Sequence, residues 1–201
     1  MGAIARRHQT CRSRGVVPPR RGSMTEPIRT RKSYDGLQGR PANYPAAPEP
    51  LEVGTYDNHT HLEIADGDTP LSVDEHLELM RQVNMLGAVQ VGVTLESSIW
   101  SANVAKNEPM LLAAVALHPN EAPLYATRQE LDDAIRGIAE LATQPRVRAI
   151  GETGLDFFRT EGQDALDAQQ YSFEQHIEIA KQNDIALMIH DREAHQNVVQ
   201  T

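Results

Sequence analysis

The sequence of 201 residues has a single cysteine, Cys11, and no long hydrophobic run. One cysteine provides neither a disulfide framework nor a cluster of thiolates that could bind a metal ion. No segment approaches the roughly 18 consecutive apolar residues that a membrane-spanning helix needs. No apolar segment of a signal peptide follows the arginines near the N-terminus. We therefore expect a cytoplasmic protein that has no membrane partner.

Acidic residues are scarce in the first quarter of the chain and abundant afterwards. Residues 1–50 contain ten of the 19 Lys and Arg residues but only three acids, whereas residues 51–201 contain nine basic and 25 acidic residues, a net charge of −16. The first part is also rich in proline and poor in large apolar side chains, so it cannot bury enough surface to offset its ordering entropy. We expect residues 1–50 to be a disordered basic tail and residues 51–201 to form the folded domain.

Three interpretations of the basic tail stay open. Its many arginines and few acids resemble an organelle transit peptide. It could instead be a basic arm that contacts nucleic acid. The third interpretation is a solvated tail without chemistry, or an upstream start with Met24 as the true first residue.

The rest of the chain alternates between segments typical of strands and of helices. Short apolar segments predict strands, and longer segments with helical spacing predict helices between them. The expected strands are 55–62, 88–95, 110–119, 146–156 and 185–191, and the expected helices are 72–87, 97–109, 127–144, 165–184 and the opening of another at 192–201. This alternation is typical of an α/β protein with a parallel sheet. A complete TIM-type (β/α)8 barrel needs about 250 residues, so we expect an incomplete barrel of about five β/α units.

Histidines and acids follow the expected strands at their carboxyl ends, where parallel β/α folds carry their functional residues. They are His59 and His61 on the first strand, His118 on the third, Glu152 and then Asp156 on the fourth, and His190 on the fifth. Imidazoles and carboxylates that converge on one rim are the ligand types of a divalent metal site.

His59 and His61 are two residues apart, so in a strand both rings point the same way and can bind one ion. The alternative is a pair of solvated histidines at the strand end. Glu152 follows an apolar segment, and two cations bridged by its carboxylate would compensate for its burial. The alternative there is an ion pair with Arg159 or Arg192.

A lysine in the bridging position is disfavoured. The only lysines after residue 50 are Lys106 and Lys181, and neither lies at the end of an expected strand. Among the remaining histidines, we expect His76, His176 and His195 to lie on helix surfaces.

Four segments resemble, in chain order, the motifs of the TatD family of metal-dependent deoxyribonucleases. They are DNHTHL (57–62), ALHPNE (116–121), AIGETGLDFF (149–158) and QHIEIAKQNDIALMIHDREA (175–194). The resemblance implies a β/α barrel in which two divalent metal ions, Mg²⁺, Mn²⁺ or Zn²⁺, activate water to cleave phosphodiester bonds in DNA or another phosphodiester substrate.

The resemblance also implies roles for individual residues. His59 and His61 would bind the first metal, His190 would bind the second, and Glu152 would bridge both. Glu152 and Asp156 would be catalytic. The residues implied to contact the substrate are Arg159 and Arg192. His118 lies at a strand end before Pro119, and from this position we expect it either to contact the substrate or to hydrogen-bond a loop carbonyl.

Two further family motifs, a histidine on a sixth strand and an aspartate near an eighth, are absent from the sequence. We therefore expect a C-terminally truncated chain that is inactive by itself. The alternatives are a remnant that at most binds metal, and a hydrolase of the same fold that acts on a small ester or amide. The acidity of residues 51–201 does not indicate a broad nucleic-acid surface, so the DNA substrate depends on the resemblance.

Overall fold

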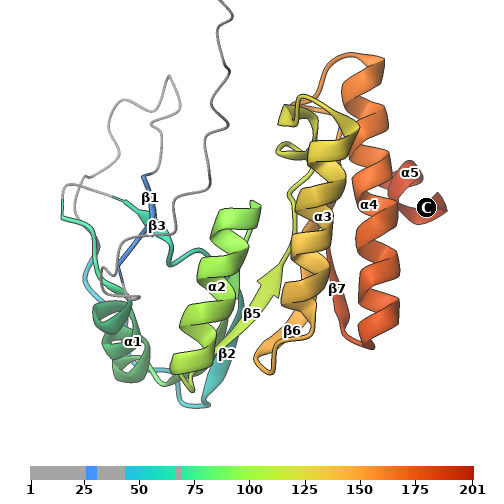
Figure 1. Ribbon diagram of the computed structural model, residues 1–201. Helices are drawn as coiled ribbons and strands as arrows, with labels where there is room; N and C mark the ends of the chain where they lie inside the picture. The colour runs from blue at the N-terminus through green and yellow to red at the C-terminus, as the bar shows by residue number, and fades with distance from the viewer. Residues whose placement is uncertain (1–25, 31–43, 67–68) are drawn as a thin grey trace, which may run out of the picture.

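The computed structural model describes residues 26–30, 44–66 and 69–201, so Cys11 and Met24 lie outside the described residues (Figure 1). The larger of its two sheets has five strands, all paired in parallel. They are β2 (Thr55–Thr60), β4 (Met85–Val91), β5 (Leu111–Val115), β6 (Val147–Asp156) and β7 (Ala186–Arg192). Their order across the sheet is their order along the chain, as in a β/α barrel.

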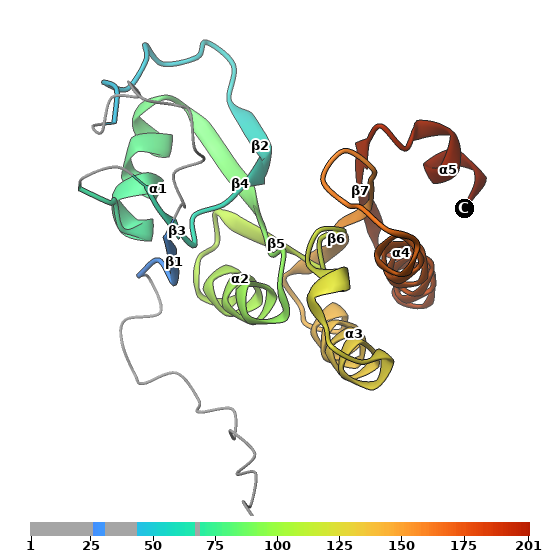
Figure 2. The same ribbon diagram turned by 90° about the horizontal axis from the view of Figure 1, so that it is seen from above.

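Helices follow the strands and cover one side of the sheet. They are α1 (Val73–Gln82), α2 (Leu95–Asn107), a short 3-10 helix (Ala122–Leu124), α3 (Arg128–Ala142), α4 (Gln163–Asn183) and α5 (His195–Gln200). Viewed from above, the strands form an arc with α2, α3 and α4 along its outside (Figure 2). The prediction of an incomplete β/α barrel is confirmed. No helix among the described residues is long and apolar enough to cross a membrane.

The helix α3 illustrates why these segments fold as they do. The Thr127 side chain accepts a hydrogen bond from the Glu130 N–H, and the Glu130 carboxylate accepts one from the Thr127 N–H, which closes a capping box. The apolar residues Leu131, Ile135 and Ile138 recur at helical spacing and are buried in the core beneath the sheet. A separate, smaller cluster of Val91, Ala114 and Ala149 belongs to β4, β5 and β6.

The end of α1 differs from the prediction that this helix runs to residue 87. The helix ends at Gln82, and β4 already begins at Met85. Asn84 adopts a left-handed conformation with φ of 62°, which helical residues avoid. Gly87 does not end a helix but lies within β4, where a side chain would collide with the Met110 carbonyl.

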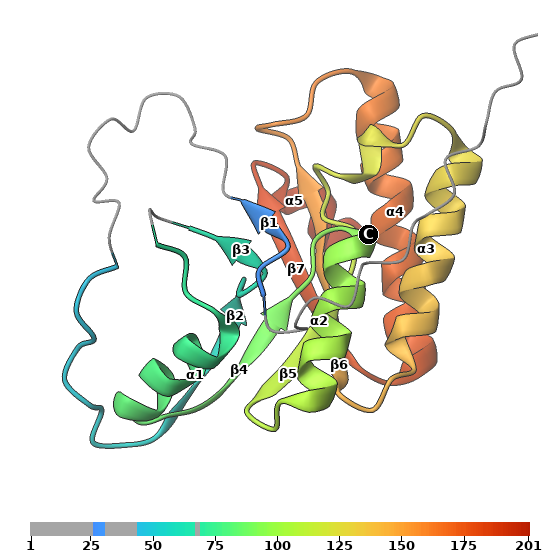
Figure 3. The same ribbon diagram turned by 60° about the vertical axis from the view of Figure 1, so that its left-hand side comes forward.

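A second, two-stranded sheet involves part of the tail that we expected to be disordered. Its strands are β1 (Arg29–Thr30) and β3 (Ile64–Ala65), which pair in parallel (Figure 3). The carbonyl of Glu26 also accepts a hydrogen bond from Nε1 of Trp100 at 3.2 Å. For residues 26–30 the expectation of disorder does not hold, because these backbone groups have partners in the folded domain.

Candidate metal site

Four histidines and one glutamate converge at the carboxyl ends of the strands. They form two groups with suitable ligand atoms, His59–His61–Glu152 and His118–Glu152–His190, and within each group the ligand atoms lie within 4.8 Å of one another. Both groups contain Glu152. The structure therefore brings together all four predicted metal ligands, with His118 as an additional member.

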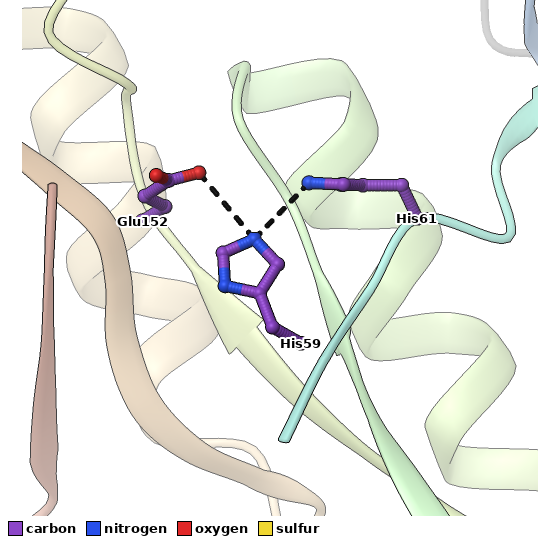
Figure 4. A group of neighbouring side chains, drawn as sticks. All are labelled: His59, His61 and Glu152. Carbon is purple, nitrogen blue, oxygen red and sulfur yellow. Dashed lines mark hydrogen bonds and ion pairs between the residues drawn. The ribbon is translucent and has the colours of Figure 1, made fainter. Parts of the chain in front are cut away.

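The first group lies where β2 ends (Figure 4). Nε2 of His59 is 3.2 Å from Nε2 of His61 and 3.5 Å from Oε2 of Glu152. Two ligands of one tetrahedral ion, each about 2.1 Å from it, are about 3.4 Å apart. The spacing of these three atoms therefore suits a single cation.

The second group lies beside the other oxygen of the same carboxylate. Oε1 of Glu152 is 2.8 Å from Nδ1 of His190 and 3.9 Å from Nε2 of His118. The two imidazole nitrogens are 3.2 Å apart. Glu152 thus presents one oxygen to each group, which is the arrangement that a carboxylate bridging two cations requires.

Register irregularities place two of these ligands. The pairing of β2 with β4 shifts between Asp57 and Thr60, a segment that contains His59. The pairing of β6 with β7 shifts between Ile150 and Thr153, a segment that contains Glu152. Bulges redirect side chains and are frequent next to functional sites. Glu152 lies within β6 and not at the strand end, where it was predicted.

Asp156 lies behind His190 and does not belong to either group. It is buried, its Oδ2 is 3.2 Å from Nε2 of His190, and the same oxygen accepts a hydrogen bond from Asn120. Its Oδ1 accepts hydrogen bonds from the N–H groups of Phe158 and Arg159. With Nε2 held by Asp156, the ring of His190 directs Nδ1 toward Glu152.

The two arginines that were predicted to contact substrate follow the same strands. Arg159 is exposed just beyond β6. Arg192 ends β7, and its guanidinium lies 3.9 Å from the centre of the Phe158 ring. This contact holds the guanidinium of Arg192 beside the aromatic ring at the strand ends.

The charges of the site are coupled through Glu152. Hydrogen bonds to Glu152 raise the pKa of His59 and of His190, although burial opposes both shifts. Burial lowers the pKa of His118 to about 4. Burial would raise the pKa of Glu152, but the hydrogen bonds from His190 and His59 hold it far below its ordinary value. At neutral pH the site therefore contains an ionised carboxylate and a neutral His118, the forms that bind metals.

The prediction that His176 lies on a helix surface is wrong. His176 is fully buried in α4, where its Nε2 accepts a hydrogen bond from the N–H of Leu117 at 3.0 Å. It therefore supports the residue that precedes His118. The signal in the sequence was its spacing from Phe173 and Ile179, which are buried on the same face of α4.

The other two histidines differ from each other. His76 is half-buried and packs edge-on against Tyr44, with ring centres 5.8 Å apart. His195 is exposed, as predicted, and its Nδ1 lies 2.8 Å from Asp191. Glu63 was not among the predicted site residues, and it is fully buried two residues after His61.

A curved parallel sheet with helices outside, and a cluster of histidines and carboxylates at the strand ends, defines the class of β/α-barrel proteins with a metal site. The family profile described as "TatD related DNase" matches residues 56–201 of this chain. The chain belongs to this TatD family.

Relatives with curated names have related descriptions. The "uncharacterized metal-dependent hydrolase TatD" of Mycobacterium tuberculosis is 35% identical over 147 residues, which cover 71% of this chain and 53% of the relative. The "3'-5' ssDNA/RNA exonuclease TatD" of Salmonella typhimurium is 31% identical over 110 residues, which cover 55% of this chain and 40% of the relative. The chain thus spans about half the length of the relatives it matches.

Solved structures show the same fold. The crystal structure of YJJV, a TatD homolog from Escherichia coli, has a TM-score of 0.59 and 25% identity, and the match covers 73% of this chain and 54% of that one. An uncharacterized amidohydrolase from Saccharomyces cerevisiae has a TM-score of 0.63 at 20% identity, with 74% and 51% covered.

Proposed function

We propose that this chain forms part of a hydrolase with two metal ions that cleaves phosphodiester bonds in single-stranded nucleic acid. The observation that carries the proposal is Glu152, whose two oxygens face two separate histidine groups. Two divalent cations, when bound, supply Lewis-acid activation of water and of the scissile phosphate. The substrate class is supported by relatives that are named as ssDNA/RNA exonucleases.

The residues of the chain have separate roles in this proposal. His59 and His61 hold one cation, His118 and His190 hold the other, and Glu152 joins the two halves. The imidazole ligands suit Zn²⁺, the carboxylate of Glu152 also suits Mn²⁺, and phosphodiester cleavage often uses Mg²⁺. Asp156 acts by keeping the ring of His190 in place and is a positioning residue.

The substrate would meet the rim above these ligands. Arg192 and Arg159 can bind a phosphate through planar guanidinium groups, with Arg192 preorganised by Phe158. The domain itself is acidic, with 25 acids against nine basic residues from residue 51 onward. A small ester or a small phosphodiester is therefore the second candidate, since it needs no extended basic surface.

The first test is metal binding to the purified chain, measured by calorimetric titration with Mn²⁺ and with Zn²⁺. We expect two equivalents of metal, and we expect Glu152→Ala to weaken both sites by at least about tenfold because both share its carboxylate. Glu140→Ala, which removes an exposed acid from α3, is the matched control. Unchanged binding by Glu152→Ala would refute the bridging role.

The second test is hydrolysis of a labelled single-stranded oligonucleotide, of a small phosphodiester and of a small ester, each with Mg²⁺, Mn²⁺ or Zn²⁺. We expect no cleavage by this chain alone. We expect a polypeptide of the relatives' full length to cleave the oligonucleotide, an activity that disappears with Glu152→Ala and persists with Glu140→Ala. Cleavage of the small substrates alone would select the second candidate. The same assays on a polypeptide of the relatives' full length show whether the remaining half is needed.

A further inference from the structure

Glu63 is a completely buried acid next to the candidate metal site. Its Oε2 accepts a hydrogen bond of 2.6 Å from Nε2 of Gln90. Its Oε1 lies 3.4 Å from Nη1 of Arg29 and 3.5 Å from Nδ1 of His61. A buried carboxylate is costly unless charged and hydrogen-bonding partners compensate it, so the placement of Arg29 matters for Glu63.

The segment Glu26–Thr30 holds Glu63 through its main chain as well. The N–H groups of Ile28 and Arg29 both donate to the Glu63 carbonyl, at 3.0 and 2.9 Å. The Glu26 carbonyl binds the indole N–H of Trp100 in α2. This segment, which contains β1, therefore contacts Glu63 at three points and is fixed to a helix at its other end.

Glu63 is in turn placed to fix the ring of His61. Nδ1 of His61 is 3.0 Å from the carbonyl of Val91, so this nitrogen carries the proton and Nε2 turns toward His59. Glu63 lies beside the same protonated nitrogen. Partners of this kind set the tautomer and orientation of a metal-binding histidine and increase its basicity.

The other oxygen of Glu63 is also fixed. Its partner Gln90 accepts a hydrogen bond from the N–H of Leu62 at 2.7 Å and donates to Oγ of Ser101 at 3.1 Å. Arg29 therefore completes a network whose remaining members belong to the folded domain.

We propose that Arg29, presented by the segment Glu26–Thr30, is a positioning residue of the metal site that acts on His61 through Glu63. The inference rests on the proposed metal site. It extends that site to a part of the chain that precedes the β/α barrel.

Arg29→Ala tests this proposal through the direction of its effect. The loss of a positive charge near a cation site would, by Coulomb's law alone, strengthen metal binding. If Arg29 positions His61, the same substitution weakens binding. We expect Mn²⁺ affinity at the His59–His61 group to fall by about tenfold, the lower end of the effect of losing a partner of a metal ligand.

Three further variants make the test specific. Arg29→Lys keeps a cation within reach of Glu63 and should restore most of the affinity. Arg81→Ala removes an arginine whose ion pair with Glu78 is exposed, and should change nothing. In a Glu63→Gln background, Arg29→Ala should cause no further loss of affinity.

A second readout does not depend on metal. The imidazole nitrogen resonances of His61, measured by NMR on the metal-free full chain, should show one tautomer in the wild type and a mixture in Arg29→Ala. Circular dichroism verifies that each variant is folded.

The outcomes separate this inference from the proposed function. If His59→Ala abolishes metal binding at the His59–His61 group while Arg29→Ala leaves affinity and the His61 tautomer unchanged, the positioning role is refuted and the metal site stands. If Arg29→Ala strengthens binding, Arg29 acts only through its charge and the inference fails. If His59→Ala has no effect on binding, the metal site itself is wrong.

Discussion

His176 is fully buried, and both nitrogens of its imidazole ring have hydrogen-bond partners inside the protein. Nδ1 donates to the Ser172 carbonyl at 2.6 Å, and Nε2 accepts from Leu117. Burial lowers the pKa of His176 to about 4, below its ordinary value of 6.5. Between these pH values the unfolded chain binds a proton that the folded chain does not, so this contribution to stability is complete above pH 6.5 and is lost as the pH falls toward 4.

The expected size is about 3 kcal/mol of unfolding free energy between pH 7 and pH 4. Urea unfolding at several pH values, for the wild type and for His176→Gln, isolates this contribution, because the other titrating groups are common to both. The exposed His195→Gln variant is the control. Equal pH dependence in the wild type and His176→Gln would contradict the prediction.

At the scale of residues, the candidate ligands could be proposed from the sequence because histidines and acids follow apolar strands. The burial of Glu63 could not, since its partner Arg29 is distant in the chain. The burial of His176 was indicated by its spacing from Phe173 and Ile179, but its partner Leu117 was not. The role of Asp156 also depended on a contact with His190 that only the strand pairing creates.

Among the elements, the pairing of β6 with β7 depends on Gly154. This glycine pairs with His190 and has φ of 145°, and a Cβ there would collide with the His190 carbonyl. We expect Gly154→Ala to force β6 and β7 apart, to lower the unfolding free energy by about 1–3 kcal/mol and to weaken metal binding at the His118–His190 group.

Gly162→Ala is the matched control for this substitution. Gly162 also has a positive φ, 89°, but a Cβ there would meet nothing within 4 Å. It should lose stability through backbone strain without losing metal affinity, as measured by thermal unfolding and metal titration. Equal metal affinity in Gly154→Ala and Gly162→Ala would show that the strand contact does not position His190.

The order and type of the elements could be predicted because apolar strands alternate with amphipathic helices. The predicted ends of the elements were less accurate where the conformation of one residue decides them. The left-handed conformation of Asn84 just after α1 is an example. The register shifts that place His59 and Glu152 could not be predicted, because they depend on the neighbouring strand and not on local preference.

For the whole molecule, metal removal should lower stability. The candidate ligands come from β2, β6, β7 and the segments after β2 and β5, so only the folded chain brings them together. Metal at a hundredfold excess over Kd should add about 2.7 kcal/mol per site to the unfolding free energy. Thermal unfolding with Mn²⁺ and with a chelator measures this difference. Glu152→Ala, whose sites bind at least about tenfold more weakly, should gain no more than about 1.4 kcal/mol per site at the same metal concentration. A wild type insensitive to the chelator would contradict the prediction.

The fold class could be predicted because the alternation of apolar strands with helices extends over the whole domain. The contact of residues 26–30 with the domain was not, because it consists mainly of backbone hydrogen bonds, which composition does not reveal.

The curvature of the sheet has a mechanical consequence. Strands β4 and β5 separate β2 from β6, yet the imidazole of His59 reaches the carboxylate of Glu152 across the inside of the arc (Figure 4). In a flat sheet these two side chains would be held apart by the width of two intervening strands. The His59–Glu152 contact therefore connects two strands that are not neighbours in the sheet. Any interaction that strengthens this contact also makes the curved sheet more resistant to flattening.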